Sequence, residues 1–65
     1  SRAPGLDKYR IQSLHHIIES NLLSKTQRTA AVQMLKEKCR IYVSGCRKRG
    51  RSDEAAHYEI LAGKY

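Results

Sequence analysis

Residues 25–47 of this chain read KTQRTAAVQMLKEKCRIYVSGCR, and this stretch decides the fold. At about 100° per residue, most of its apolar side chains project into a single arc of about 120° on a helix. The side chains in this arc are those of Ala31, Val32, Leu35, Cys39, Tyr42, Val43 and Cys46. The pattern therefore predicts an amphipathic helix over residues 25–47, with this apolar stripe facing the core.

A second amphipathic segment precedes this helix, over about residues 6–22. Its apolar residues recur at spacings of three and four, which places them on one helix face. They are Ile11, Leu14, Ile18 and Leu22, with Ile17 at the edge of the face and His15 at its margin. The side chains of Tyr9, His16 and Ser20 belong to the opposite face. The spacing predicts a first helix that packs against the longer one.

The two helices are expected to be separated by a break near residues 21–24. Ser24 and Gln27 have the spacing of a capping box, which marks the start of a helix. Asn21 is suited to end the first helix as its C-cap. No Pro or Gly enforces the break, so one continuous rod of about 40 residues is the alternative.

A short third helix is predicted over about residues 53–62. Gly50 ends the middle helix, Ser52 caps the third, and Gly63 ends it. Asp53 and Glu54 then place negative charge in the first turn, where the helix dipole favours it. The apolar edge of this helix is thin and consists of Ala56, Ile60 and Leu61. We therefore expect the third helix to be the least stable element or one that a partner completes.

These segments predict a small all-α three-helix domain, which consists of an antiparallel helix pair and a short third helix. The expected contacts of the pair are made by Leu14, Ile18, Leu35 and Tyr42, with the third helix packed across them. Residues 6–65 are expected to form this single domain. Residues 1–5, SRAPG, are interpreted as a linker or a cloning remnant.

Composition narrows the setting in which such a domain works. No apolar run approaches the roughly 18 residues of a membrane span, and no signal-peptide pattern is present. Two cysteines in 65 residues do not indicate a disulfide-built secreted scaffold. We expect a chain without membrane contact in a reducing intracellular compartment, cytoplasmic or nuclear or in the nucleoid.

Thirteen Lys and Arg residues against six Asp and Glu give the chain a formal charge of +7. Lys36, Arg40 and Arg47 fall within about 40° on the middle helix, along about 16 Å of its length. Lys48, Arg49 and Arg51 continue this charge into the following turn. Since such a ladder suits a phosphate backbone, the first hypothesis is a nucleic-acid-binding regulatory domain. These six residues are its predicted phosphate contacts, and an acidic protein surface is the other partner they fit.

A protein-interaction or oligomerisation domain of a larger regulatory protein is the alternative hypothesis. Met34 and Ile41 lie together outside the apolar stripe of the middle helix, where one layer of helices does not cover them. Ile60 and Leu61 of the thin third helix are the other predicted protein contacts. A homodimer is one form of this alternative.

The sequence indicates no enzyme, no cofactor and no small-molecule substrate, because no nucleophile–base pair or glycine-rich phosphate loop occurs. A metal site is not expected from Cys39, Cys46 and the three histidines, since the cysteines are seven residues apart. The same separation on one helix prevents a disulfide between them. As an alternative to simple burial, Cys46 beside Arg47 is a candidate oxidation sensor.

A helix-turn-helix motif fits poorly, because the charges follow the flank of the longest helix and the short third helix opens with acidic residues. The tyrosines expected to be free to stack on bases are Tyr9, Tyr58 and Tyr65. Residues 48–55, KRGRSDEA, resemble the inter-helix turn of tetratricopeptide and pentatricopeptide repeats. Such repeats need about three units to be stable, and the sequence has no second copy, so no family residue is carried over.

Overall fold

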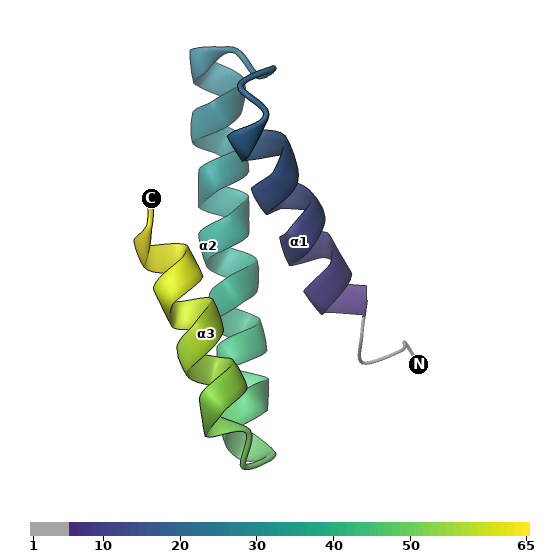
Figure 1. Cartoon of the computed structure of the whole chain (residues 1–65), viewed down its shortest axis with the longest axis vertical. Helices are drawn as coiled ribbons and strands as arrows, with labels where there is room; N and C mark the ends of the chain where they lie inside the picture. Colours follow the sequence, from purple (N-terminus) through teal and green to yellow (C-terminus); the bar gives the residue numbers. More distant parts are fainter. Residues whose placement is uncertain (1–5) are drawn as a thin grey trace.

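The computed structural model describes residues 6–65, which form three helices and contain no strand. Helix α1 spans Leu6–Glu19, α2 spans Lys25–Lys48 and α3 spans Ser52–Gly63. Figure 1 shows α2 in the middle, with α1 and α3 running antiparallel to it on either side. The expected all-α three-helix domain is confirmed. The predicted linker, residues 1–5, lies outside the described residues.

The break between the first two helices is confirmed, and a continuous rod is wrong. The hydroxyl of Ser24 accepts a hydrogen bond from the backbone N–H of Gln27 at 3.2 Å, and the Gln27 amide oxygen accepts one from the Ser24 N–H at 3.0 Å. Asn21 has a φ of 60°, a left-handed conformation that Asn tolerates better than most residues. This turn reverses the chain between α1 and α2.

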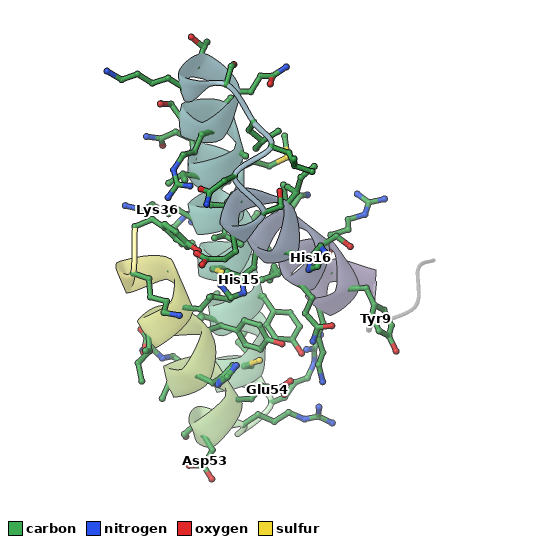
Figure 2. The ribbon with its side chains drawn as sticks, turned by 45° about the horizontal axis from the view of Figure 1, so that its top comes forward. Tyr9, His15, His16, Lys36, Asp53 and Glu54 are labelled. Atoms are coloured by element: carbon green, nitrogen blue, oxygen red, sulfur yellow. The ribbon has the colours of Figure 1, made fainter. Side chains whose placement is uncertain are left out.

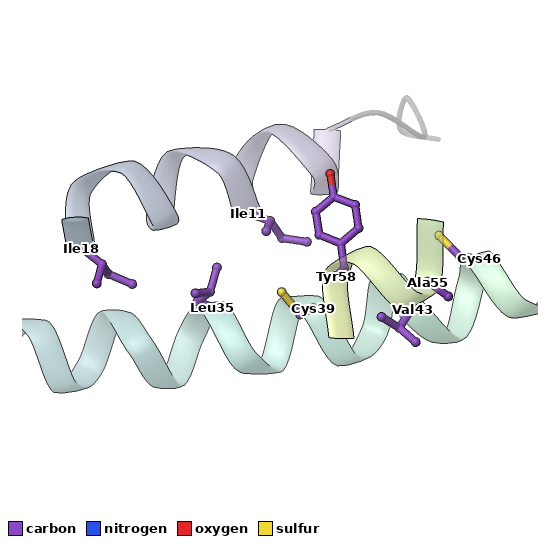
Figure 3. Packing of buried hydrophobic residues seen from close by; sticks show 8 residues of the cluster. All are labelled: Ile11, Ile18, Leu35, Cys39, Val43, Cys46, Ala55 and Tyr58. Atoms are coloured by element: carbon purple, nitrogen blue, oxygen red, sulfur yellow. The ribbon is translucent and has the colours of Figure 1, made fainter. Parts of the chain in front are cut away.

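The core is one cluster contributed by all three helices (Figure 3). The predicted stripe of α2 supplies four of its eight members, and Ala31, Val32 and Tyr42 pack half-buried around them. The buried members of the cluster are Ile11, Ile18, Leu35, Cys39, Val43, Cys46, Ala55 and Tyr58. Leu14 lies against this cluster. The predicted pairing of the first two helices is therefore confirmed.

Leu22 is the exception on the first helix, because 83% of its surface is exposed. Helix α1 ends at Glu19, and Asn21 then turns the chain away from the helical path. A residue beyond that turn no longer shares the face of Ile11 and Ile18. The prediction that Leu22 belongs to the core face is wrong.

The apolar face predicted for α3 is also wrong in its register. Ala55 and Tyr58 are buried, whereas Ala56 is exposed and Ile60 is 71% exposed. Burying the larger aromatic ring rotates the helix so that Ile60, about 200° away, points to solvent. Leu61 is half-buried, as expected for an edge residue.

Helix α3 begins one residue earlier than predicted. Ser52 is its first residue, Arg51 occupies the cap position, and no side chain caps the helix there. The predicted cap at Ser52 is therefore wrong. Gly50 does end α2, with a φ of 75° and the two hydrogen bonds of a Schellman turn, Arg51 N–H to Cys46 C=O and Gly50 N–H to Arg47 C=O.

Helix α3 is joined to the other helices by polar contacts as well as by burial. The Tyr42 hydroxyl of α2 donates a hydrogen bond to Glu54 Oε2 at 2.8 Å, and Lys8 Nζ of α1 lies 3.7 Å from the same oxygen. At its other end, the Tyr65 hydroxyl donates a hydrogen bond to Glu19 of α1. None of the described helices combines the length and apolar character needed to cross a bilayer.

Candidate functional site

A groove of about 630 Å³ runs between α2 and α3. Buried side chains of Cys39, Val43 and Tyr58 form its floor, together with half-buried Ala62. Basic side chains of α2 line it, and they are Lys36, Arg40, Arg47 and Lys48. The structure thus brings four of the six predicted phosphate contacts to one surface.

The lining carries an excess of positive charge. Four cationic side chains face one carboxylate, that of Glu59, so the net charge of the lining is +3. Lys36, labelled in Figure 2, and Lys48 at the C-terminus of α2 are the first and last of these cations along the helix. Among residues 6–65, no carboxylate lies within ion-pair distance of either lysine.

The two groove arginines already have acidic partners. Arg40 donates hydrogen bonds from Nε and Nη2 to Glu37, and this contact lowers the pKa of the Glu37 carboxyl and raises that of the guanidinium. Arg47 donates from Nη2 to Glu59 across the groove. A guanidinium has five N–H donors, so each arginine keeps donors for a further anion.

Arg49 and Arg51 lie outside the groove. Arg51 Nη1 is 3.5 Å from Glu54 Oε1, in a shallow hollow formed by residues 50–54. The Arg49 guanidinium folds back along α2, such that a Cβ added to Gly45 would lie 3.5 Å from Nη1. These two predicted contacts therefore flank the groove at the α2–α3 turn without lining it.

Most tyrosines are engaged within the fold. The ring of Tyr58 is only 3% exposed and packs edge-on against Tyr42 with centroids 5.0 Å apart, so its expected availability for base stacking is wrong. Burial of Tyr65 and its hydrogen bond to Glu19 raise its pKa to about 12, and the Arg28 guanidinium lies 5.9 Å from its ring centroid. Tyr9 is 65% exposed and projects from α1 (Figure 2).

A second groove, of about 480 Å³, lies between α1 and α3. All three histidines of the chain line it, His15 and His16 from α1 and His57 from α3. Figure 2 labels His15 and His16, which are consecutive residues of α1. The sequence analysis missed this cluster, because residues 15 and 57 share a surface only after α1 and α3 have both packed against α2. The remaining lining consists of Gln12, Glu19, Tyr58, Ile60, Leu61 and Lys64.

One histidine atom in this groove lacks a partner. Nε2 of His15 is buried and makes no hydrogen bond within the described part of the chain. It lies 4.0 Å from Glu19 Oε2, which already accepts the hydrogen bond of Tyr65. That hydrogen bond is the main reason why the pKa of Glu19 is lowered.

The two cysteines are buried free thiols, Cys39 being 1% and Cys46 0% exposed. Burial raises the pKa of the Cys39 thiol. Oxidation sensing by Cys46 requires an accessible thiol, which this position lacks. Across residues 6–65, no three His, Cys, Asp or Glu side chains converge as metal ligands.

The predicted protein contacts fall into two groups. Met34 and Ile41 are 52% and 53% exposed, which confirms that neither α1 nor α3 covers them. Ile60 and Leu61 both line the groove between α1 and α3, called here the histidine groove. It lies on the other side of α3 from the groove between α2 and α3, called here the basic groove.

Comparisons with protein-family models, with curated proteins and with solved structures found no match to this chain.

Proposed function

We propose that this domain binds nucleic acid through the phosphate backbone, in the basic groove between α2 and α3. The observation that carries this proposal is the lining of that groove, where Lys36, Arg40, Arg47 and Lys48 face a single carboxylate. Phosphate groups gain from such a cluster both by charge attraction and by release of condensed counterions. The two unpaired lysines are the first contacts, and the arginines add their remaining N–H donors.

The length of the groove matches several phosphates. Lys36 and Lys48 are twelve residues apart on one helix, which corresponds to about 18 Å along its axis. One strand of a duplex carries a phosphate every 3.4 Å of axis, so about five nucleotides span this length. The groove is thus long enough for one strand to meet all four cations.

Binding of this kind is expected to show little sequence preference. The aromatic ring in the groove floor, Tyr58, is buried and presents no face on which a base could stack. Lysine and arginine contacts to phosphate fix position along a strand without reading bases. We therefore expect duplexes of different sequence to bind with similar affinity.

The test is an equilibrium titration of labelled duplex DNA at about 50 and about 200 mM salt. Four phosphate contacts predict a slope of log K against log salt of about −3.6. The variant K36Q/K48Q is expected to bind more weakly, with a slope about 1.8 units shallower. A wild-type chain that fails to bind at the lower salt would rule the proposal out.

A matched control separates the groove from net charge. The variant R10Q/K25Q also loses two positive charges, but at exposed positions that do not line the groove. It is expected to keep most of the affinity and the salt slope of the wild-type chain. Equal weakening in both double variants would indicate diffuse attraction to the whole surface.

A second candidate function is protein association through the exposed apolar side chains of Met34 and Ile41. The specific observation is that both keep about half of their surface in solvent although they lie on the central helix. Self-association is the simplest form, and sedimentation velocity over a wide concentration range tests it. A dimer that M34S/I41S abolishes supports this function, whereas a monomer at every concentration argues against it.

A further inference from the structure

Helix α3 forms a ridge between two grooves of different chemistry. Tyr58 lines both of them, and its buried ring separates the basic groove against α2 from the histidine groove against α1. A polyanion lying in the basic groove is therefore one helix width from the histidines, about 10 Å. The second groove is close enough for the same ligand to reach.

The charge of the histidine groove depends on pH. The charged groups that line it are Glu19 from α1 and Lys64 next to the end of α3, and these two cancel while the histidines are neutral. Three protonated histidines raise the net charge of the lining to +3, the value of the basic groove. Histidine is the side chain whose ordinary titration range falls between pH 5 and 8.

On the α1 side, His15 lies beside the one carboxylate of the groove, that of Glu19. The unpartnered Nε2 of His15 lies 4.0 Å from Glu19 Oε2, so a protonated His15 has this carboxylate as its ion-pair partner. The groups facing Glu19 from outside α1 are the Tyr65 hydroxyl, the Lys64 ammonium and the Arg28 guanidinium of α2. His15 thus offsets the one carboxylate of the groove.

His16 and His57 are exposed, and no acidic side chain of the described residues forms an ion pair with either. Together with Lys64 they present up to three cations to solvent along the α1–α3 groove. Imidazolium groups donate charge-assisted hydrogen bonds to phosphate oxygens, as lysine and arginine do.

We infer that the α1–α3 groove is a second phosphate-binding surface, which binds phosphates when mild acid protonates its histidines. It then holds the part of the nucleic-acid backbone that lies beside the strand in the basic groove. This inference rests on the function proposed above. His16, His57 and Lys64 contact the phosphates, and His15 acts by neutralising Glu19. The domain then binds nucleic acid weakly at neutral pH and more tightly as its histidines take up protons.

The experiment is the duplex titration at about pH 7.5 and about pH 5.5, each over a salt series. For the wild-type chain we expect affinity to rise at least about tenfold at the lower pH and the salt slope to steepen by about 1.8, the value for two added phosphate contacts. In H16Q/H57Q, which changes only exposed side chains, affinity and slope are expected to stay nearly constant between the two pH values. Circular dichroism of both proteins at both pH values confirms that each is folded.

A second variant makes the two proposals separable. K36Q/K48Q is expected to bind more weakly at both pH values and to keep the gain in affinity on acidification. Wild-type binding at pH 7.5 without a gain at pH 5.5, or a gain of the same size in H16Q/H57Q, would overturn the inference and leave the basic groove standing. Absence of wild-type binding at both pH values would instead overturn the proposed function and this inference with it.

Discussion

The hydroxyl of Tyr42 on α2 donates a hydrogen bond to Glu54 of α3 at 2.8 Å, and this contact joins the two helices that form the basic groove. Lys8 and Arg51 approach the same carboxylate, at 3.7 and 3.5 Å. Glu54 is thus the point at which α1, α2 and the α2–α3 turn meet.

Removing the hydroxyl tests the junction directly. Tyr42→Phe is expected to lower the free energy of unfolding by about 1.5–3 kcal/mol, because one hydrogen bond to a charged acceptor is lost while the ring still packs on Tyr58. Urea denaturation followed by circular dichroism measures the change. Tyr9→Phe, at an exposed tyrosine, serves as the control and should leave the stability unchanged. A Tyr42→Phe chain as stable as the wild type would show that the contact contributes nothing.

Acid is expected to destabilise the fold through two carboxylates that accept tyrosine hydrogen bonds, in addition to the Glu37 carboxyl paired with Arg40. Hydrogen bonds from Tyr42 and Tyr65 lower the pKa values of Glu54 and Glu19 below their ordinary value of 4.5. A carboxyl with a lowered folded-state pKa contributes stability above about pH 4.5, and this contribution is lost as the pH falls through the folded-state pKa. The thermal midpoint of the wild-type chain should therefore fall between about pH 5 and pH 3. The variant Y42F/Y65F should show a smaller fall, and an equal fall would assign acid sensitivity to other groups.

The buried and exposed leucines provide a contrast within the apolar residues. Leu35 is fully enclosed, and its replacement by Ala is expected to lower the free energy of unfolding by about 2–5 kcal/mol. In a domain this small, such a loss is enough to leave a large fraction of the molecules unfolded. Leu22 is 83% exposed, and Leu22→Ala should change the stability by less than about 0.5 kcal/mol. Thermal denaturation of the two variants measures both effects. A large cost at Leu22 would contradict the turn at Asn21 that carries this side chain out of the core.

Two glycines near helix ends are expected to respond differently when a methyl group is added to each. Gly50 has a φ of 75°, so Gly50→Ala strains the backbone by about 1 kcal/mol although nothing lies within 4 Å of the added Cβ. Gly63 lies at the end of α3 with open space around it, and Gly63→Ala should be neutral or stabilising. Denaturant midpoints of the two variants decide this. Equal effects at both positions would mean that the turn after α2 relaxes freely.

Features set by neighbouring residues could be predicted from the sequence. The α2 stripe follows from helical spacing alone, and the Ser24–Gln27 box and the Gly50 turn each depend on residues within a few positions. The ladder of Lys36, Arg40 and Arg47 likewise remains on one flank of one helix.

Features that depend on how α3 is placed could not be predicted. The choice between burying Tyr58 and burying Ile60 is made by the space that α1 and α2 leave, which no local spacing encodes. The pairing of Arg47 with Glu59 and the shared surface of His15 and His57 join residues that are distant in the sequence. Charge density alone predicts Arg49 and Arg51 as phosphate contacts, whereas the structure places them at the α2–α3 turn, outside the lining of the groove.

The most direct test of the central claim is to map bound duplex DNA on the domain by two-dimensional NMR at low salt. The account predicts that the amide signals of Lys36, Arg47, Lys48 and Ala62 shift on binding at neutral pH, while those of Met34 and Ile41 stay in place. Shifts centred on Met34 and Ile41, or no shifts at any residue, would contradict binding of nucleic acid in the groove between α2 and α3.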